Sequence, residues 1–84
     1  MDIQLVKSAL SYISSRDRPI WVKIGMALKS KYGEAGFEIW DEWSRTSHNY
    51  NESDSKTTWR SFDAHGGITI GTLIKYAQDN GFER

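Results

Sequence analysis

The sequence contains no cysteine and a single proline, Pro19. Without cysteine, neither a disulfide framework nor a thiolate metal site can form. No segment approaches the roughly 20 apolar residues that a transmembrane helix needs, and the first ten residues lack the charged start and apolar run of a signal peptide. These absences predict an intracellular, cytoplasmic protein. Because 84 residues leave little room for a second core, residues 1–84 are expected to form a single domain.

An excess of charge of one sign is also lacking, since 11 basic and 11 acidic side chains give a net charge of zero. The charges are nevertheless distributed unevenly. Residues 1–31 carry six basic and two acidic side chains, residues 32–54 carry one and six, and residues 55–84 carry four and three. This polarity is compatible with one basic face that binds a polyanion, or with two differently charged solvated surfaces.

Apolar side chains recur at helical spacing in several segments, whereas no alternation with period two is long enough to predict a sheet. The first helix is expected to begin after Asp2 as N-cap, to carry an apolar stripe as far as Ile13, and to end in the polar segment that follows. The second starts near Pro19, reaches about Tyr32 and is terminated by Gly33. It is apolar nearly all round, which predicts a central position.

A third helix is expected over residues 34–45, with aromatic side chains on one face and charged side chains on the other. A short fourth helix starts near Asn51 or Ser53. A fifth begins with Thr69 as N-cap and is closed by Gly81. The sequence therefore predicts an all-α fold, a compact bundle of about five short helices.

The stretch HGGITIGTL is close to a phosphate-binding loop, because Gly66 and Gly71 have the spacing of the Walker A glycines. However, Thr72 and Leu73 occupy the positions of the essential lysine and the magnesium-binding hydroxyl, so an NTPase is not predicted. His48 and the histidine of this stretch lie in separate loops without a periodic partner. No metal site, no cofactor and no catalytic group is therefore predicted.

Two interpretations of this loop remain. In the first, Gly66 and Gly67 only form a tight turn before a helix capped by Thr69. In the second, the free amides at the start of that helix also bind a nucleic-acid phosphate. The two are compatible, because a cap and an anion site use neighbouring groups.

Two tryptophans lie beside basic residues in the sequence: Trp21 near Lys23, and Trp59 next to Arg60. Exposed aromatic rings of this kind stack on bases while the cations follow the backbone. The alternative is that both indoles belong to the core, as aromatic residues at helical spacing usually do. The candidate nucleic-acid contacts are Trp21, Lys23, Lys29, Lys31, Trp59, Arg60, Gly66, Gly67 and Thr69.

Four motifs in order resemble those of the primase C-terminal family, second type, over about residues 8–82. The resemblance implies an all-helical accessory domain of replication proteins from phages, plasmids and other mobile elements. In that family the domain usually lies beside a primase-polymerase domain, often before a helicase, and does not hold the nucleotidyl-transfer carboxylates. The motifs are WVKIGMAL at 21–28, WDEWS at 40–44, WRSF at 59–62 and GITIGTL at 67–73.

The resemblance and the basic N-terminal third together predict a non-catalytic module that helps a primase or polymerase engage single-stranded DNA template. The expected partners are single-stranded DNA and a primase-polymerase, DNA polymerase or replicative helicase, fused to the domain or encoded separately, with no membrane. The alternative is an interaction module that docks such a partner without touching DNA. In that case Glu38, Asp41 and Glu42, one turn apart on the third helix, form the contact surface; otherwise they are a solvated acidic face.

Overall fold

The computed structural model describes residues 3–63 and 66–83, which include helices and no strand. The all-α class predicted from the sequence is therefore confirmed for these residues. The predicted N-cap Asp2 lies outside them. The elements are α1 (Ile3–Leu10), α2 (Arg18–Tyr32), the 3-10 helix η1 (Gly33–Ala35), α3 (Gly36–Ser44), α4 (Glu52–Ser61) and α5 (Ile70–Asp79).

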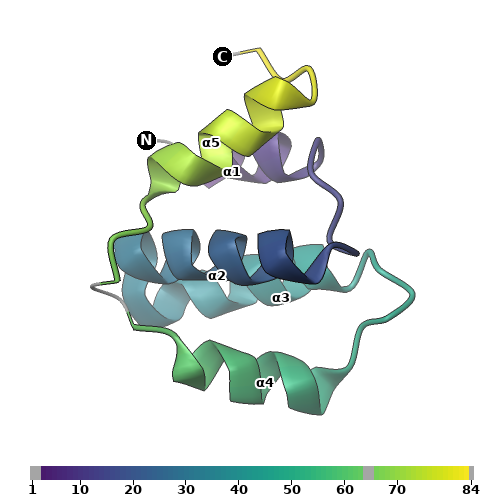
Figure 1. The fold of residues 1–84 in the computed structure, drawn as a ribbon, viewed down its shortest axis with the longest axis vertical. Helices are drawn as coiled ribbons and strands as arrows, with labels where there is room; N and C mark the ends of the chain where they lie inside the picture. The colour runs from purple at the N-terminus through teal and green to yellow at the C-terminus, as the bar shows by residue number, and fades with distance from the viewer. Residues whose placement is uncertain (1–2, 64–65, 84) are drawn as a thin grey trace.

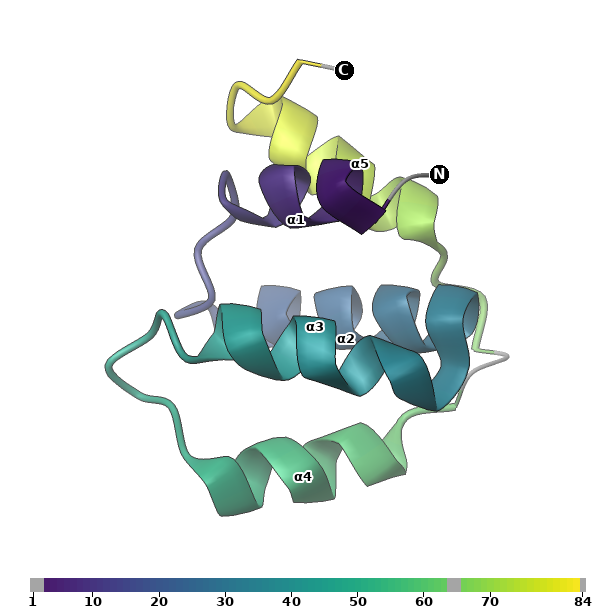
Figure 2. The ribbon, with the colours of Figure 1, turned by 180° about the vertical axis from the view of Figure 1, so that it is seen from behind.

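The helices form three layers, which can be followed in Figures 1 and 2. Helices α1 and α5 lie side by side in one outer layer, α2 and α3 form the middle layer, and α4 forms the other outer layer. Helix α2 packs against α3, α4, α5 and η1, and its Ile24, Ala27 and Leu28 are fully buried. The prediction that the second helix is central is confirmed.

Local sequence signals mark the ends of α2 and α4. Asp17, which the sequence analysis missed, caps α2 with a carboxylate that accepts a first-turn amide at 3.3 Å. Pro19 lies in the first turn of α2 and Gly33 ends the helix with a φ of 63°, both as predicted. Asn51 caps α4, because its side-chain oxygen accepts a first-turn amide at 2.9 Å.

Helix α1 is shorter than predicted. It ends at Leu10, and a turn follows in which the amides of Tyr12 and Ile13 bond to carbonyls three residues earlier. The Ser11 hydroxyl also donates a hydrogen bond to the Ser8 carbonyl at 2.6 Å. This bond satisfies one of the carbonyl groups at the end of the helix. Ile13 is still buried in the core. Its apolar side chain is therefore explained by burial and not by continuation of the helix.

The starts of α3 and α5 also differ from the prediction. The 3-10 turn η1 delays the start of α3 to Gly36, where a Cβ atom would lie 2.7 Å from the Leu28 carbonyl oxygen. The absence of a side chain at Gly36 therefore allows the backbones of α2 and α3 to approach closely. Thr69 occupies the N-cap position of α5, but its side chain makes no capping hydrogen bond. Gly81, just beyond α5, has a φ of 101° and supports the end of that helix.

Trp40 is the centre of an aromatic cluster that joins the middle layer to α4. Its ring stacks on that of Trp21 with a centroid distance of 4.5 Å, and it contacts Trp59 and Phe62 at 5.4 Å each. The indole N–H groups of the four tryptophans all donate to acceptors within the chain, which allows these large side chains to be buried. Trp21 Nε1 donates to Ser44 Oγ (2.7 Å), Trp40 Nε1 to the Trp21 carbonyl (3.0 Å), Trp43 Nε1 to the Ile13 carbonyl (3.0 Å) and Trp59 Nε1 to Glu34 Oε2 (2.9 Å).

Candidate nucleic-acid interface

The two tryptophans that the sequence offered as candidates for base stacking are buried. Trp21 and Trp59 are 8% and 3% exposed, and their indole N–H groups donate to Ser44 Oγ and Glu34 Oε2. A base can stack only on a ring face that solvent can reach. The burial of both rings therefore favours the core alternative for Trp21 and Trp59.

Lys29 also lies inside the molecule, with a side chain only 12% exposed. Its Nζ donates to the Trp59 carbonyl at 2.9 Å and lies 3.8 Å from Glu34 Oε1. It is also 5.4 Å from the centre of the Trp59 ring. Lys29 therefore joins α2 to α4 and η1, and its charge is already compensated. The sequence placed this lysine among the phosphate contacts, and its burial argues against that role.

The remaining cations are exposed but do not form one stripe. Lys23 points towards α5, where its Nζ lies 3.4 Å from the Tyr76 hydroxyl. Lys31, at the end of α2, lies over the ring of the neighbouring Tyr32 at 5.6 Å. Arg60 is exposed near the end of α4, in the opposite outer layer from α5 (Figure 1). The predicted contacts are thus divided between two faces of the molecule.

A groove between α2 and α5 gathers cationic and apolar side chains. It consists of two adjoining hollows, of about 420 and about 360 Å³, that share Lys23 and Ile68 in their linings. We call both hollows together the α2–α5 groove. Its first hollow is lined by Arg18, Pro19, Val22, Lys23, Met26 and Ile68, and its second by Lys23, Ile68, Thr72, Lys75, Tyr76 and Asp79.

The entrance to α5 borders this groove. Gly67 has a φ of 89°, so it makes the tight turn predicted for the glycine pair. Gly66 and Gly67 are exposed, and Ile68 follows them directly in the groove wall. The free amides in the first turn of α5, after Thr69, therefore begin beside the groove. Their partial positive charge favours an anion there.

Two groove residues, Lys75 and Tyr76, were not identified from the sequence. A signal for them was present, because Lys75 and Tyr76 follow Thr72 by about one helical turn and so share a face with it. That face could not be recognised as a binding surface without knowing that Lys23 of α2 lies opposite. The groove is a product of packing between two helices that are distant in the sequence.

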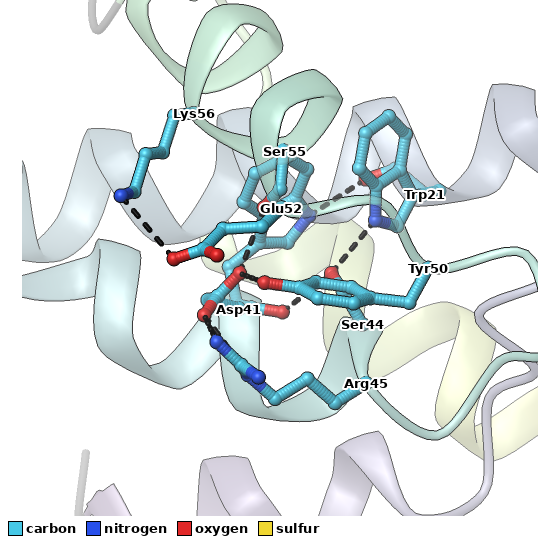
Figure 3. A network of polar contacts seen from close by, with 9 residues as sticks. Trp21, Asp41, Ser44, Arg45, Tyr50, Glu52, Ser55 and Lys56 are labelled. Carbon is cyan, nitrogen blue, oxygen red and sulfur yellow. Dashed lines mark hydrogen bonds and ion pairs between the residues drawn. The ribbon is translucent and has the colours of Figure 1, made fainter.

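The predicted acidic face of α3 is interrupted, because Asp41 is engaged in an internal network (Figure 3). Its Oδ1 accepts hydrogen bonds from the Tyr50 hydroxyl (2.7 Å) and from Ser55 Oγ (2.8 Å). Its Oδ2 accepts two from the Arg45 guanidinium, at 3.1 and 3.2 Å. The side chain is 14% exposed. Asp41 therefore ties α3 to the start of α4, while its neighbours Glu38 and Glu42 are exposed.

The environment of Asp41 lowers its pKa below the ordinary value of 3.8. Burial alone raises the pKa of this carboxyl group, but the hydrogen bonds from Tyr50, Ser55 and Arg45 favour the charged form and together outweigh burial. A carboxylate with a lowered pKa stabilises the fold at neutral pH. This contribution is present above the unfolded-state pKa and is lost as the pH falls through the folded-state pKa.

Asp41→Asn is expected to lower the free energy of unfolding at pH 7 by about 2 kcal/mol, because an amide cannot replace the charged acceptor of these hydrogen bonds. Urea denaturation at a series of pH values provides the measurement. Below about pH 4 the wild type should lose stability more steeply than the variant. The free energy of unfolding of the variant still decreases as the pH falls, because the hydrogen bond from Arg18 lowers the pKa of Asp54 as well.

Glu38→Gln is the matched control for this experiment, since Glu38 lies one turn earlier on α3 and is exposed. Its stability should stay within about 0.5 kcal/mol of the wild type. Equal stability of Asp41→Asn and Glu38→Gln at pH 7 would show that the Asp41 network does not stabilise the fold.

Among the described residues, no group of three or more histidine or acidic side chains is placed to hold a metal ion. No helix there is long and apolar enough to cross a membrane.

A comparison with the curated proteins and with the solved structures gave no significant match. The family model described as primase C terminal 2 (PriCT-2) matches residues 6–77.

Proposed function

The chain belongs to the primase C terminal 2 (PriCT-2) family, and from this membership we propose that it helps a primase or polymerase engage single-stranded DNA template. The α2–α5 groove is the binding surface in this proposal. Lys23 and Lys75 contact backbone phosphates from its two walls, and the free amides that follow Gly66 and Gly67 at the start of α5 contact another. The module itself carries out no catalytic step.

The observation that supports this proposal is the convergence of two lysines on the second hollow of the α2–α5 groove. Lys23 comes from α2 and Lys75 from α5, and both line the same hollow with Ile68 and Tyr76. Proteins that bind single strands combine cations that follow the backbone with apolar and aromatic surface for the bases. The groove offers both, whereas the face that carries Lys29 has its charge compensated by Glu34.

Lys23→Ala and Lys75→Ala are each expected to weaken binding of a labelled single-stranded oligonucleotide several-fold at low salt. Each removes about one phosphate contact, so each should reduce the slope of log affinity against log salt by about 0.7 to 1. Fluorescence anisotropy titrations at several salt concentrations measure both quantities.

The matched control is Lys56→Ala, because Lys56 is exposed on α4 and paired with Glu52 at 3.3 Å. Its affinity and salt slope should equal those of the wild type. Arg60→Ala tests the α4 face in the same way: a loss there, with none in Lys23→Ala or Lys75→Ala, would move the DNA site from the groove to α4.

A second candidate function follows if the wild type binds no single-stranded DNA at low salt. The module then docks a primase-polymerase or helicase partner by protein contacts alone. The exposed Glu38 and Glu42 on α3 are the residues that support this alternative. Asp41 contributes little to such a surface, since its oxygens are occupied by Tyr50, Ser55 and Arg45.

A further inference from the structure

Resting on the proposed function, we infer that the second hollow of the α2–α5 groove is a subsite for one unpaired nucleobase, with Tyr76 as its stacking residue. The hollow has a volume of about 360 Å³, which is large enough for a base and its sugar. The inference identifies which part of the strand enters the protein, and it makes unpaired bases a requirement for tight binding.

Tyr76 is placed to offer part of its ring to the hollow. It is half-buried on α5, its backbone carbonyl accepts a hydrogen bond from the Asn80 side chain at 2.8 Å, and its hydroxyl lies 3.4 Å from Lys23 Nζ. The partial burial of the ring and the contact of its hydroxyl with Lys23 restrict the side chain, so little conformational entropy is lost when a base stacks on it. Ile68, in the same lining, supplies further apolar surface. Tyr76 thus replaces the buried Trp21 and Trp59 as the candidate aromatic contact.

The charges around the hollow favour a base inside it and phosphates at its edge. Asp79 lines the hollow together with Lys23 and Lys75. A phosphate held inside would be repelled by the Asp79 carboxylate, whereas a neutral base would not. A carboxylate can also accept a hydrogen bond from the amino group of a base. The two exposed lysines are long enough to reach phosphates on either side of the base.

An oligonucleotide of abasic sites tests the inference with the unmodified 84-residue chain. It carries the same number of phosphates as a normal single strand but no bases. The chain should bind the normal strand about tenfold more tightly than the abasic strand, because stacking of one base contributes on this scale. Equal affinity for the two strands overturns the subsite and leaves the proposed function standing. Binding to neither strand overturns both.

Two variants assign the effect to the ring of Tyr76. In Tyr76→Leu the affinity for the normal strand should fall about tenfold, to that for the abasic strand, whereas Tyr76→Phe, which keeps the ring, should retain the difference. Circular dichroism checks that both variants keep the wild-type helix content. If folded Tyr76→Leu still binds the normal strand tenfold more tightly than the abasic strand, the role of Tyr76 is overturned. Should Tyr76→Leu fail to fold, the abasic comparison with the wild type and with Tyr76→Phe still decides whether a base is bound.

Discussion

Replacing Gly25 with alanine is expected to lower the free energy of unfolding by about 2 to 3 kcal/mol. Gly25 lies in the buried face of α2, where the rings of Phe62 and Trp40 pack directly against its backbone. A Cβ atom added there would overlap the Phe62 ring at Cε2, and would lie 2.8 Å from Phe62 Cζ and 2.9 Å from Trp40 Cε2. Real Cβ atoms do not approach other atoms this closely, so a neighbour must move.

Neither neighbour of Gly25 can move without loss. Trp40 is fully buried and donates its indole N–H to the Trp21 carbonyl at 3.0 Å. Phe62 lies at the end of α4 and can swing outward, but this would break its edge-to-face contacts with Trp40 and Trp59. The expected loss therefore combines overpacking with exposure of an aromatic ring.

Gly71→Ala is the matched control, because it places the same methyl group in another helix without crowding. The nearest atom to a Cβ at Gly71 is Thr69 Oγ1 at 3.5 Å, an ordinary contact. Its stability should be unchanged or higher by up to about 1 kcal/mol, since alanine favours the helix more than glycine does. Urea denaturation followed by tryptophan fluorescence compares the three proteins. A Gly25→Ala variant as stable as the wild type would contradict the close packing of Phe62 and Trp40 on Gly25.

Trp40→Ala is expected to have the largest effect, a loss of about 4 kcal/mol in the free energy of unfolding. The ring is fully buried and contacts Trp21, Trp59 and Phe62. Its removal leaves a cavity between the middle layer and α4 and removes the hydrogen bond from the indole to the Trp21 carbonyl. Since small domains are stable by only about 5 to 15 kcal/mol, this loss is a large part of the total.

Thermal unfolding monitored by circular dichroism measures the effect, with Tyr12→Ala as the control. Tyr12 is also a large aromatic residue, but it is 45% exposed, and its ring contacts that of Phe82 near the chain end. Its removal should lower stability by about 1 kcal/mol or less. Similar losses in the two variants would mean that Trp40 is not the centre of the core.

The local signals in the sequence were sufficient for several helix ends. Pro19, Gly33 and Asn51 act through their own backbone restrictions or through side chains that reach only the adjacent turn. Such effects do not depend on distant residues, so they can be identified before the fold is known. The end of α1 was misplaced because Ile13 continues the apolar pattern after the helix has stopped, and pattern alone does not separate burial from helicity.

The candidate site was less accessible from the sequence. The class of residue was anticipated, with Lys23 and the glycine turn before α5 among the predicted contacts. The exposure of each residue was not, because helical periodicity tells which residues share a face but not which element covers that face. Lys29 illustrates this limit: it looks like a surface cation in the sequence, yet α4 and η1 cover it.

By itself, the sequence determined the all-helical class, the family and several local helix boundaries, because these depend on composition, periodicity and short-range backbone chemistry. The tertiary structure alone decided that Trp21 and Trp59 are core residues, that Asp41 is an internal acceptor, and that Lys23 and Tyr76 meet although they are 53 positions apart. Those outcomes require the packing of α2 against α4 and α5, which brings distant segments together and sets which side chains remain open to a ligand.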